Sequence, residues 1–200
     1  MATEKPAITI ELIKKLKELS GVGLTDAKKA LVEAKGDFDK ALEAMRKKGL
    51  TKAEKRGDRE TREGRIDSYI HDGRLGAIVE VNCETSFVAK TDEFKTLTHQ
   101  IAMQVASMNP LYVSEDDIPE ADKKAKQKEL ESNFKGPEKM KDQIIAGQMK
   151  KAFADKVLMN QPYILDDTKT VEQFIKEAIA KTGENITIRQ FKRIELGVTE

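Results

Sequence analysis

Few side chains in this sequence could carry out covalent chemistry, and their spacing matches no established catalytic or metal-binding pattern. The chain has one cysteine, Cys83, and two histidines, His71 and His99. Neither histidine has a cysteine or another histidine at the spacing of a zinc site. Cys83 and His99 could pair as nucleophile and base, but the sequence indicates no third group that would orient the histidine. We therefore expect Cys83 to be a small buried residue of a strand, and His71 an exposed residue of a turn.

The carboxylates and glycines offer no better case for catalysis. Glu84 and Asp92 could act as an acid–base pair, but a glutamate at the end of a strand is more simply a solvated side chain. Gly21-Val22-Gly23 lacks the third glycine of a dinucleotide-binding fingerprint and follows a helical pattern instead of a strand. No G-x-x-x-x-G-K-[ST] phosphate loop occurs in the sequence. We expect a protein that is not an enzyme and that has neither a cofactor nor a metal site.

The composition does not favour a nucleic-acid-binding or a membrane protein. The chain has 200 residues, 36% of them charged, and its formal net charge is only +1. Such a balance lacks the basic field of a nucleic-acid-binding protein, and the absence of tryptophan limits stacking on bases. No run approaches the roughly 20 apolar residues of a membrane span, and the first residues lack the apolar core of a signal peptide. Because a single cysteine also suits a reducing compartment, we expect a cytoplasmic protein.

The stretch with the most informative composition is residues 81–90, Val-Asn-Cys-Glu-Thr-Ser-Phe-Val-Ala-Lys. Alternating apolar residues from Leu75 to Val81 predict a strand before it. Thr91, which two acidic residues follow, is suited to cap a helix after it. Phe87 lies in the connection, and connections usually run over the surface. Its ring must therefore either pack back into the core, as hydrophobicity alone favours, or be displayed to a partner.

Three short amphipathic helices are predicted within residues 1–50. Thr25 is suited to cap the second helix and Gly36 to end it, while Asp37 is suited to cap the third and Gly49 follows its basic end. A bundle of this size is near the lower limit for independent folding. The sequence Gly-Asp-Phe-Asp-Lys-Ala-Leu-Glu-Ala-Met resembles the third helix of ubiquitin-associated-type bundles, and this resemblance implies a binding module.

The rest of the chain predicts a mixed core domain over residues 65–200. Residues 51–64 contain no large apolar residue and predict a charged linker or a solvated helix. Asp72-Gly73 is a strong hairpin signal between two apolar runs. Residues 115–160, of which 115–135 are charge-dense, predict a helical hairpin, and a further helix and a last strand follow it. The expected fold class is α+β, with a three-helix ubiquitin-associated-like bundle and a small antiparallel sheet packed with helices.

Three blocks of sequence, in order, resemble the bacterial elongation factor Ts family. Residues 16–31 (LKELSGVGLTDAKKAL) resemble its N-terminal signature, and residues 80–89 (EVNCETSFVA) resemble its central Thr-Asp-Phe-Val signature. Residues 160–163 (NQPY), followed by residues 169–171 (KTV), resemble a third block. The resemblance covers essentially residues 8–198. Three blocks at matching intervals are far more specific than any one of them.

The resemblance implies a guanine nucleotide exchange factor for elongation factor Tu in translation elongation. In the family, the N-terminal module docks on the nucleotide-binding domain of factor Tu, and a central loop intrudes beside the magnesium and phosphate site so that GDP leaves. The residues that this implies for docking are Val22, Gly23, Leu24 and Thr25. The residues that it implies for the magnesium-dislocating loop are Thr85, Ser86, Phe87 and Val88.

The chain departs from the family pattern in ways that affect these expectations. Ser86 stands where the family has an aspartate, and a hydroxyl cannot perturb a cation by charge, so we expect steric intrusion by Phe87 and Val88. Thr25 replaces an apolar residue that some relatives carry, which leaves more of the docking contact to Leu24. Longer relatives have a duplicated core, whereas this chain has one copy, so a homodimer that presents two surfaces is a further expectation.

Other functions stay open at the level of the sequence. The first 50 residues alone also suit a ubiquitin-associated-type adaptor that reads a helix or peptide of another protein. An RNA-binding translation accessory protein could act through residues 46–65, and its RNA affinity would then depend steeply on salt. A small enzyme that uses Cys83 would be sensitive to iodoacetamide.

Overall fold

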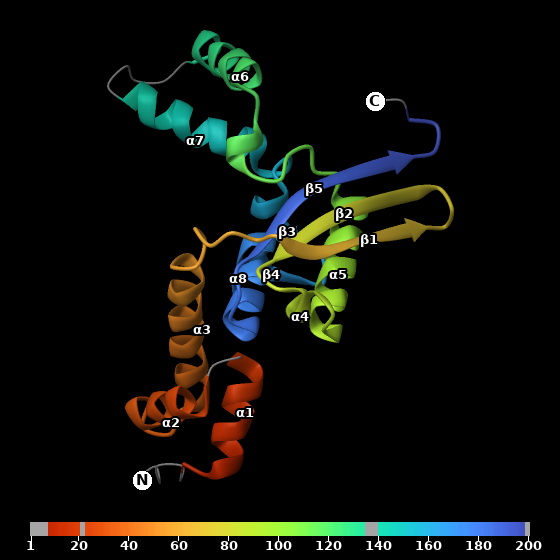
Figure 1. Ribbon diagram of the computed structural model, residues 1–200. Helices are drawn as coiled ribbons and strands as arrows, with labels where there is room; N and C mark the ends of the chain where they lie inside the picture. The colour runs from red at the N-terminus through yellow and green to blue at the C-terminus, as the bar shows by residue number, and fades with distance from the viewer. Residues whose placement is uncertain (1–7, 21–22, 135–139, 199–200) are drawn as a thin grey trace. The chain divides into compact units, whose positions relative to one another are not determined.

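The computed structural model describes residues 8–20, 23–134 and 140–198 (Figure 1). It has the α+β fold that the sequence predicts, with three helices first and a small antiparallel sheet with further helices after them. The chain forms two compact units, each assembled from three separate stretches. The first unit comprises residues 1–65, 81–95 and 173–187, and the second comprises residues 66–80, 96–172 and 188–200.

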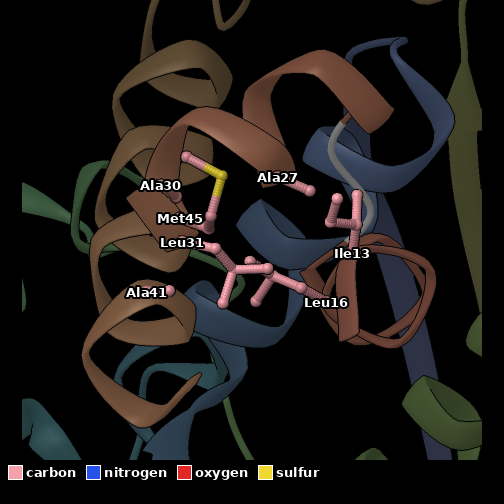
Figure 2. Close-up of a cluster of buried hydrophobic side chains, with 7 residues drawn as sticks. All are labelled: Ile13, Leu16, Ala27, Ala30, Leu31, Ala41 and Met45. Atoms are coloured by element: carbon pink, nitrogen blue, oxygen red, sulfur yellow. The ribbon is translucent and has the colours of Figure 1, made fainter. Parts of the chain in front are cut away.

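The N-terminal helices α1 (Ile10–Ser20), α2 (Leu24–Glu33) and α3 (Phe38–Glu54) pack around one hydrophobic cluster (Figure 2). Each helix presents one apolar stripe, as helical periodicity requires, and the three stripes meet. Leu16 and Leu31 are fully buried at this meeting point. The complete cluster is Ile13, Leu16, Ala27, Ala30, Leu31, Ala41 and Met45. The bundle expected within residues 1–50 is thus present.

The helix ends match the sequence signals in part. Asp37 caps α3 as predicted, because its Oδ1 accepts a hydrogen bond of 3.1 Å from the backbone N–H of Lys40. The prediction that Thr25 caps α2 is wrong. Gly23 is the N-cap, with extended φ and ψ of −65° and 152°, and no side chain caps this end. Thr25 is an exposed residue of the first turn, so α2 begins two residues earlier than a Thr25 cap predicts.

Helix α3 does not end near Gly49, contrary to the sequence prediction, but continues to Glu54. The glycine is explained by packing: a Cβ at Gly49 would lie 3.2 Å from the Cβ of Ala180 in α8 (Val171–Thr182). Since only a hydrogen fits comfortably there, α3 and α8 can approach closely. Beyond this point, Ala53 is buried, and Lys176 Nζ lies 3.4 Å from the Glu54 carboxylate.

The main sheet contains β1 (Glu63–His71), β2 (Leu75–Cys83) and β5 (Ile186–Glu195), in the order β1-β2-β5. The predicted Asp72-Gly73 hairpin is confirmed. Both residues have positive φ, 49° and 66°, which is the signature of the type I′ turn that fits the twist of adjacent strands. The predicted alternation of β2 is also confirmed, since Ala77, Val79, Val81 and Cys83 are all buried.

Strand β2 leads into the short helix α4 (Ser86–Ala89) and then α5 (Asp92–Met108). The predicted cap of α5 is confirmed, because Thr91 Oγ1 accepts a hydrogen bond of 3.2 Å from the N–H of Phe94. The connection between β2 and α5 is therefore an ordered helical turn with a cap on the helix that follows it.

Residues 115–160, in the second unit, contain the helical hairpin that the sequence predicts. A short 3-10 turn (Glu115–Asp117) precedes α6 (Glu120–Ser132), which contacts α7 (Lys141–Ala154). Ile118, Phe153 and Val157 form a small core at its base. Beyond another 3-10 turn (Leu158–Asn160), the short strands β3 (Pro162–Tyr163) and β4 (Asp166–Thr170) form a second sheet. The sequence did not indicate this pair, because strands so short and polar show no readable alternation.

Candidate functional site

The side chain of Phe87 is displayed to solvent at the middle of α4. It is 80% exposed, the highest fraction among the large hydrophobic side chains that the structure describes. The next two residues, Val88 and Ala89, are only 7% and 8% exposed. A single turn of helix thus has one apolar side fixed in the interior and one aromatic ring outside. Of the two alternatives left by the sequence, the structure supports display of Phe87 over core packing.

Thr85 fixes the start of α4. Its backbone is extended, with φ −128° and ψ 150°, and its Oγ1 accepts a hydrogen bond of 3.4 Å from the N–H of Val88. Its carbonyl accepts hydrogen bonds from the N–H of Ala89 at 3.2 Å and from the thiol of Cys83 at 3.3 Å. The four residues of the predicted loop are therefore one capped turn. Thr85, Ser86 and Phe87 are exposed, and Val88 is buried.

Two carboxylates attach this turn to the segment between α8 and β5. Both oxygens of Glu184 accept hydrogen bonds from Thr85, at 3.0 Å from its backbone N–H and at 2.6 Å from its hydroxyl. Glu84 Oε1 accepts from the N–H of Asn185 at 2.6 Å and from Arg59 Nη1 at 3.4 Å. The expectation that Glu84 is simply solvated is wrong, since it holds a partner 101 residues away.

Asn185 extends the network to the chain that follows α3. It is 2% exposed, and its Nδ2 donates hydrogen bonds to the carbonyls of Gly57 at 3.1 Å and Arg59 at 2.7 Å. The guanidinium of Arg56 likewise donates to the carbonyl of Ile179 at 3.2 Å. The start of α4 is thus connected to α8 and to residues 56–59 by hydrogen bonds in the first unit.

Cys83 is the buried strand residue that the sequence predicts. It is fully buried, and burial, followed by the nearby charge of Glu184, raises the pKa of its thiol to about 11. Such a thiol carries almost no thiolate at neutral pH, so it is a poor nucleophile. In the second unit, His99 Nδ1 lies 3.7 Å from Asp67, and the exposed His71 shares a 3.0 Å hydrogen bond with the hydroxyl of Tyr69.

The residues expected to dock on a partner lie at the start of α2. Gly23, Leu24 and Thr25 are all exposed, and Leu24 retains 51% of its surface. Val22 lies outside the described residues. Leu19, at the end of α1, is 55% exposed, although it continues the apolar spacing of Leu12 and Leu16 that predicts the buried stripe of this helix. Its position at the end of that stripe, next to the break at Gly21, was the signal that could have identified it as a surface residue.

Two further features are absent from the described residues. Within residues 8–20, 23–134 and 140–198, no three histidine, cysteine, aspartate or glutamate side chains are grouped to hold a metal ion. No helix within the same ranges is long and apolar enough to span a membrane.

Comparison with known proteins identifies a family over nearly the whole chain. The family model described as Elongation factor TS matches residues 13–198. Elongation factor Ts of Thermotoga maritima is 50% identical over 193 residues, which cover 95% of this chain and 96% of the relative. Elongation factor Ts of Moorella thermoacetica is 48% identical over 190 residues, which cover 92% and 93%. That of Thermoanaerobacter pseudethanolicus is 45% identical over 194 residues, which cover 95% of each chain.

Proposed function

We propose that this chain, which belongs to the elongation factor Ts family, promotes nucleotide exchange on elongation factor Tu. It binds the Tu·GDP complex in the cytoplasm and promotes GDP release by inserting Phe87 beside the magnesium and phosphate site. The observation that carries this proposal is that Phe87 is exposed on a turn with fixed neighbours: Thr85 before it is hydrogen-bonded to Glu184, and Val88 after it is buried. A ring presented in this way can enter a partner's pocket without first leaving its own core.

The free energy available from Phe87 is useful but limited. Burying a phenylalanine in an apolar pocket is worth about 1.5–3 kcal/mol. That is roughly one to two decades in an equilibrium constant, which helps to hold a displaced element of the partner. The remaining affinity must come from docking, for which the exposed Leu19 and Leu24 of the N-terminal bundle supply apolar surface. The family match also spans the central and C-terminal blocks, which an adaptor function of the bundle alone would not require.

The structure changes the roles proposed for the other loop residues. Val88 is buried, so in this proposal it fastens the turn and leaves intrusion to Phe87. Ser86 is exposed beside Phe87 but carries no charge, so it cannot act on the partner's cation by charge as an aspartate could. Thr85 holds the turn by its backbone and hydroxyl.

The proposed reaction makes and breaks no covalent bond in this chain. Bound magnesium bridges the phosphate charges of GDP, so a displaced magnesium environment weakens nucleotide binding. The factor must therefore bind the nucleotide-free partner more tightly than the GDP complex. By thermodynamic linkage, GDP weakens binding of the factor by the same ratio. Cellular GTP, by binding the emptied site, would then release the factor.

Stopped-flow release of a fluorescent GDP analogue from factor Tu of the same organism tests the proposal. The wild-type chain should accelerate release, and Phe87→Ala should slow the accelerated rate by about tenfold or more, in line with the loss of roughly 1.5–3 kcal/mol. Leu111→Ala is the matched control, because it removes another exposed apolar side chain, 55% exposed in the second unit. Equal rates for wild type and Phe87→Ala would contradict the proposed intrusion.

A further inference from the structure

We propose that Glu184 is a positioning residue for nucleotide exchange, which fixes the turn that carries Phe87 without touching the partner itself. This inference rests on the proposed function and assigns a role to a residue that lies 97 positions from Phe87 in the sequence. The proposal starts from the two hydrogen bonds that Glu184 accepts from Thr85, the N-cap of α4.

The Glu184 carboxylate determines how the Thr85 hydroxyl is used. The hydroxyl donates its only proton to Glu184 Oε1 at 2.6 Å, a short distance that is typical of a bond to a charged acceptor. Its lone pairs are then left to accept the N–H of Val88, which is the bond that starts the helical turn. Without the carboxylate the hydroxyl loses the acceptor that fixes its proton, and this cap loses its fixed orientation. Glu184 therefore acts on the turn through both the backbone and the side chain of Thr85.

A second contact makes the attachment reciprocal. The side chain of Glu184 binds the backbone N–H of Thr85, and the side chain of Glu84 binds the backbone N–H of Asn185 at 2.6 Å. Two neighbouring residues of one segment are thus joined to two neighbouring residues of the other. Two such bonds restrain residues 84–85 from sliding along residues 184–185, whereas a single bond would still allow one segment to pivot on the other.

Glu184 is itself held by the end of α8. Gly183 has a φ of +83°, a left-handed conformation that turns the chain out of the helix, and its N–H donates to Ile179 at 3.0 Å. The N–H of Glu184 donates to Thr182 Oγ1 at 3.3 Å, and that hydroxyl donates to the carbonyl of Ala178 at 2.9 Å. The carboxylate therefore starts from a rigid helix terminus, which suits a positioning role.

The exposure of Phe87 explains why its backbone must be fixed. A ring that is 80% exposed receives little support from its own neighbours, so its direction depends on the turn beneath it. If the turn were loose, insertion would have to order it, and that cost would be subtracted from the free energy gained in the partner's pocket. The two hydrogen bonds from Thr85 to Glu184, which we call the clamp, order the turn before the chain binds its partner.

The test compares Glu184→Gln with two variants of Thr85 in GDP release at increasing concentrations of the chain. An amide at position 184 keeps the size of the side chain, but its NH2 group cannot accept, so one of the two bonds is lost in the present geometry. We expect Glu184→Gln to lower the rate at saturation by about tenfold, the effect of losing one charge-assisted hydrogen bond. Thr85→Val should lower it at least as much, because it also loses the bond from the Val88 N–H. The concentration for half-maximal effect should not change, because docking uses the N-terminal bundle. Thr85→Ser, which keeps the hydroxyl, should retain the wild-type rate.

Glu93→Gln is the matched control, since it removes an exposed carboxylate from the first turn of α5. Amide hydrogen exchange in the free chain supplies a measurement that does not need the partner. The amides of Thr85 and Val88 should exchange faster in Glu184→Gln, while those in the centre of α8 should not change. If wild type fails to accelerate GDP release, the proposed function fails, and amide exchange still tests the clamp.

Several results would overturn the positioning role. It is wrong if both amides exchange at wild-type rates in Glu184→Gln. It is also wrong if they exchange faster but GDP release at saturation does not slow, or if only the half-maximal concentration shifts. If Glu184→Gln does not fold, Thr85→Val takes its place: it removes both the bond to Glu184 and the bond from the Val88 N–H, so a wild-type rate at saturation in Thr85→Val would overturn the positioning role.

Discussion

Phe87 and Val88 are adjacent in sequence and have opposite roles in the free chain. Because Phe87 is 80% exposed, Phe87→Ala should change the free energy of unfolding by less than about 0.5 kcal/mol. Val88 is 7% exposed, so Val88→Ala should lower that free energy by about 2 kcal/mol through lost burial and a cavity. Urea denaturation of both variants measures the difference. A large loss of stability in Phe87→Ala would mean that the ring packs inside the protein.

Cys83 should make stability depend on alkaline pH. Burial raises the pKa of the folded thiol from its ordinary value of 9.0 to about 11. Above pH 9 the unfolded chain loses this proton while the folded chain retains it, so unfolding is favoured increasingly as pH rises from 9 towards 11. The stability of wild type relative to Cys83→Ala should therefore fall between pH 8 and pH 10.5. A difference that stays constant with pH would contradict a protonated buried thiol.

Local pattern explains which of these residues could be predicted. The alternation of apolar residues in β2 was enough to place Cys83 inside, because the period of a strand is two residues. Glu84 could not be placed in the same way, since its partner Asn185 is 101 positions away. Phe87 lies in a helix of four residues, which is too short for any periodicity to distinguish its inner from its outer side.

At the scale of elements, two buried glutamines give the sequence block at residues 160–163 a structural role. Gln161 is 1% exposed, and its Nε2 donates to the carbonyls of Asp155 at 2.7 Å and Met108 at 3.2 Å. Gln104, fully buried in α5, donates to Gln161 Oε1 at 3.1 Å and accepts from the N–H of Ile164 at 2.8 Å. The two amides thus fasten the β3–β4 pair to the ends of α5 and α7. The block was identified from resemblance alone, without this physical reason.

Gln161→Leu should lower the free energy of unfolding by about 3 kcal/mol. The substitution removes the donor of the Asp155 and Met108 carbonyls and leaves Gln104 Nε2 with only its bond to the Pro162 carbonyl, and each unsatisfied buried group costs roughly 1–3 kcal/mol. Gln127→Leu is the control, because Gln127 is exposed on α6 and bonds only at the surface to Glu131. Urea denaturation compares the two variants. Equal stabilities would show that the buried amide network contributes little.

At the scale of the molecule, the order of elements was predictable and their grouping was not. Amphipathic periods, caps and the Asp72-Gly73 turn are local signals, and they give three helices, a hairpin and a helical hairpin in the right sequence. The two compact units each combine three separate stretches of chain. Such grouping depends on contacts between residues a hundred positions apart, which have no local signal. The boundaries 1–50, 51–64 and 65–200 stay a prediction.

The oligomeric state is a further prediction at this scale. A chain that holds one copy of a core duplicated in longer relatives could supply the second copy by self-association, so we expect a homodimer. Light scattering coupled to gel filtration should give twice the 22.4 kDa of the chain. A mass of 22.4 kDa at every concentration would show that one chain works alone.

The way α4 is fastened has a consequence for how this protein can change over generations. The turn is attached to the rest of the chain by the hydrogen bonds of Thr85 to Glu184 and by the buried side chains of Val88 and Ala89. The exposed side chains of Ser86 and Phe87, at the tip of the turn, contribute almost nothing to this attachment. Mutations at the tip can therefore accumulate at little cost in folding, so the proposed partner contact can change from species to species without loss of stability. A serine in place of the family's aspartate is the kind of exchange that such an arrangement tolerates.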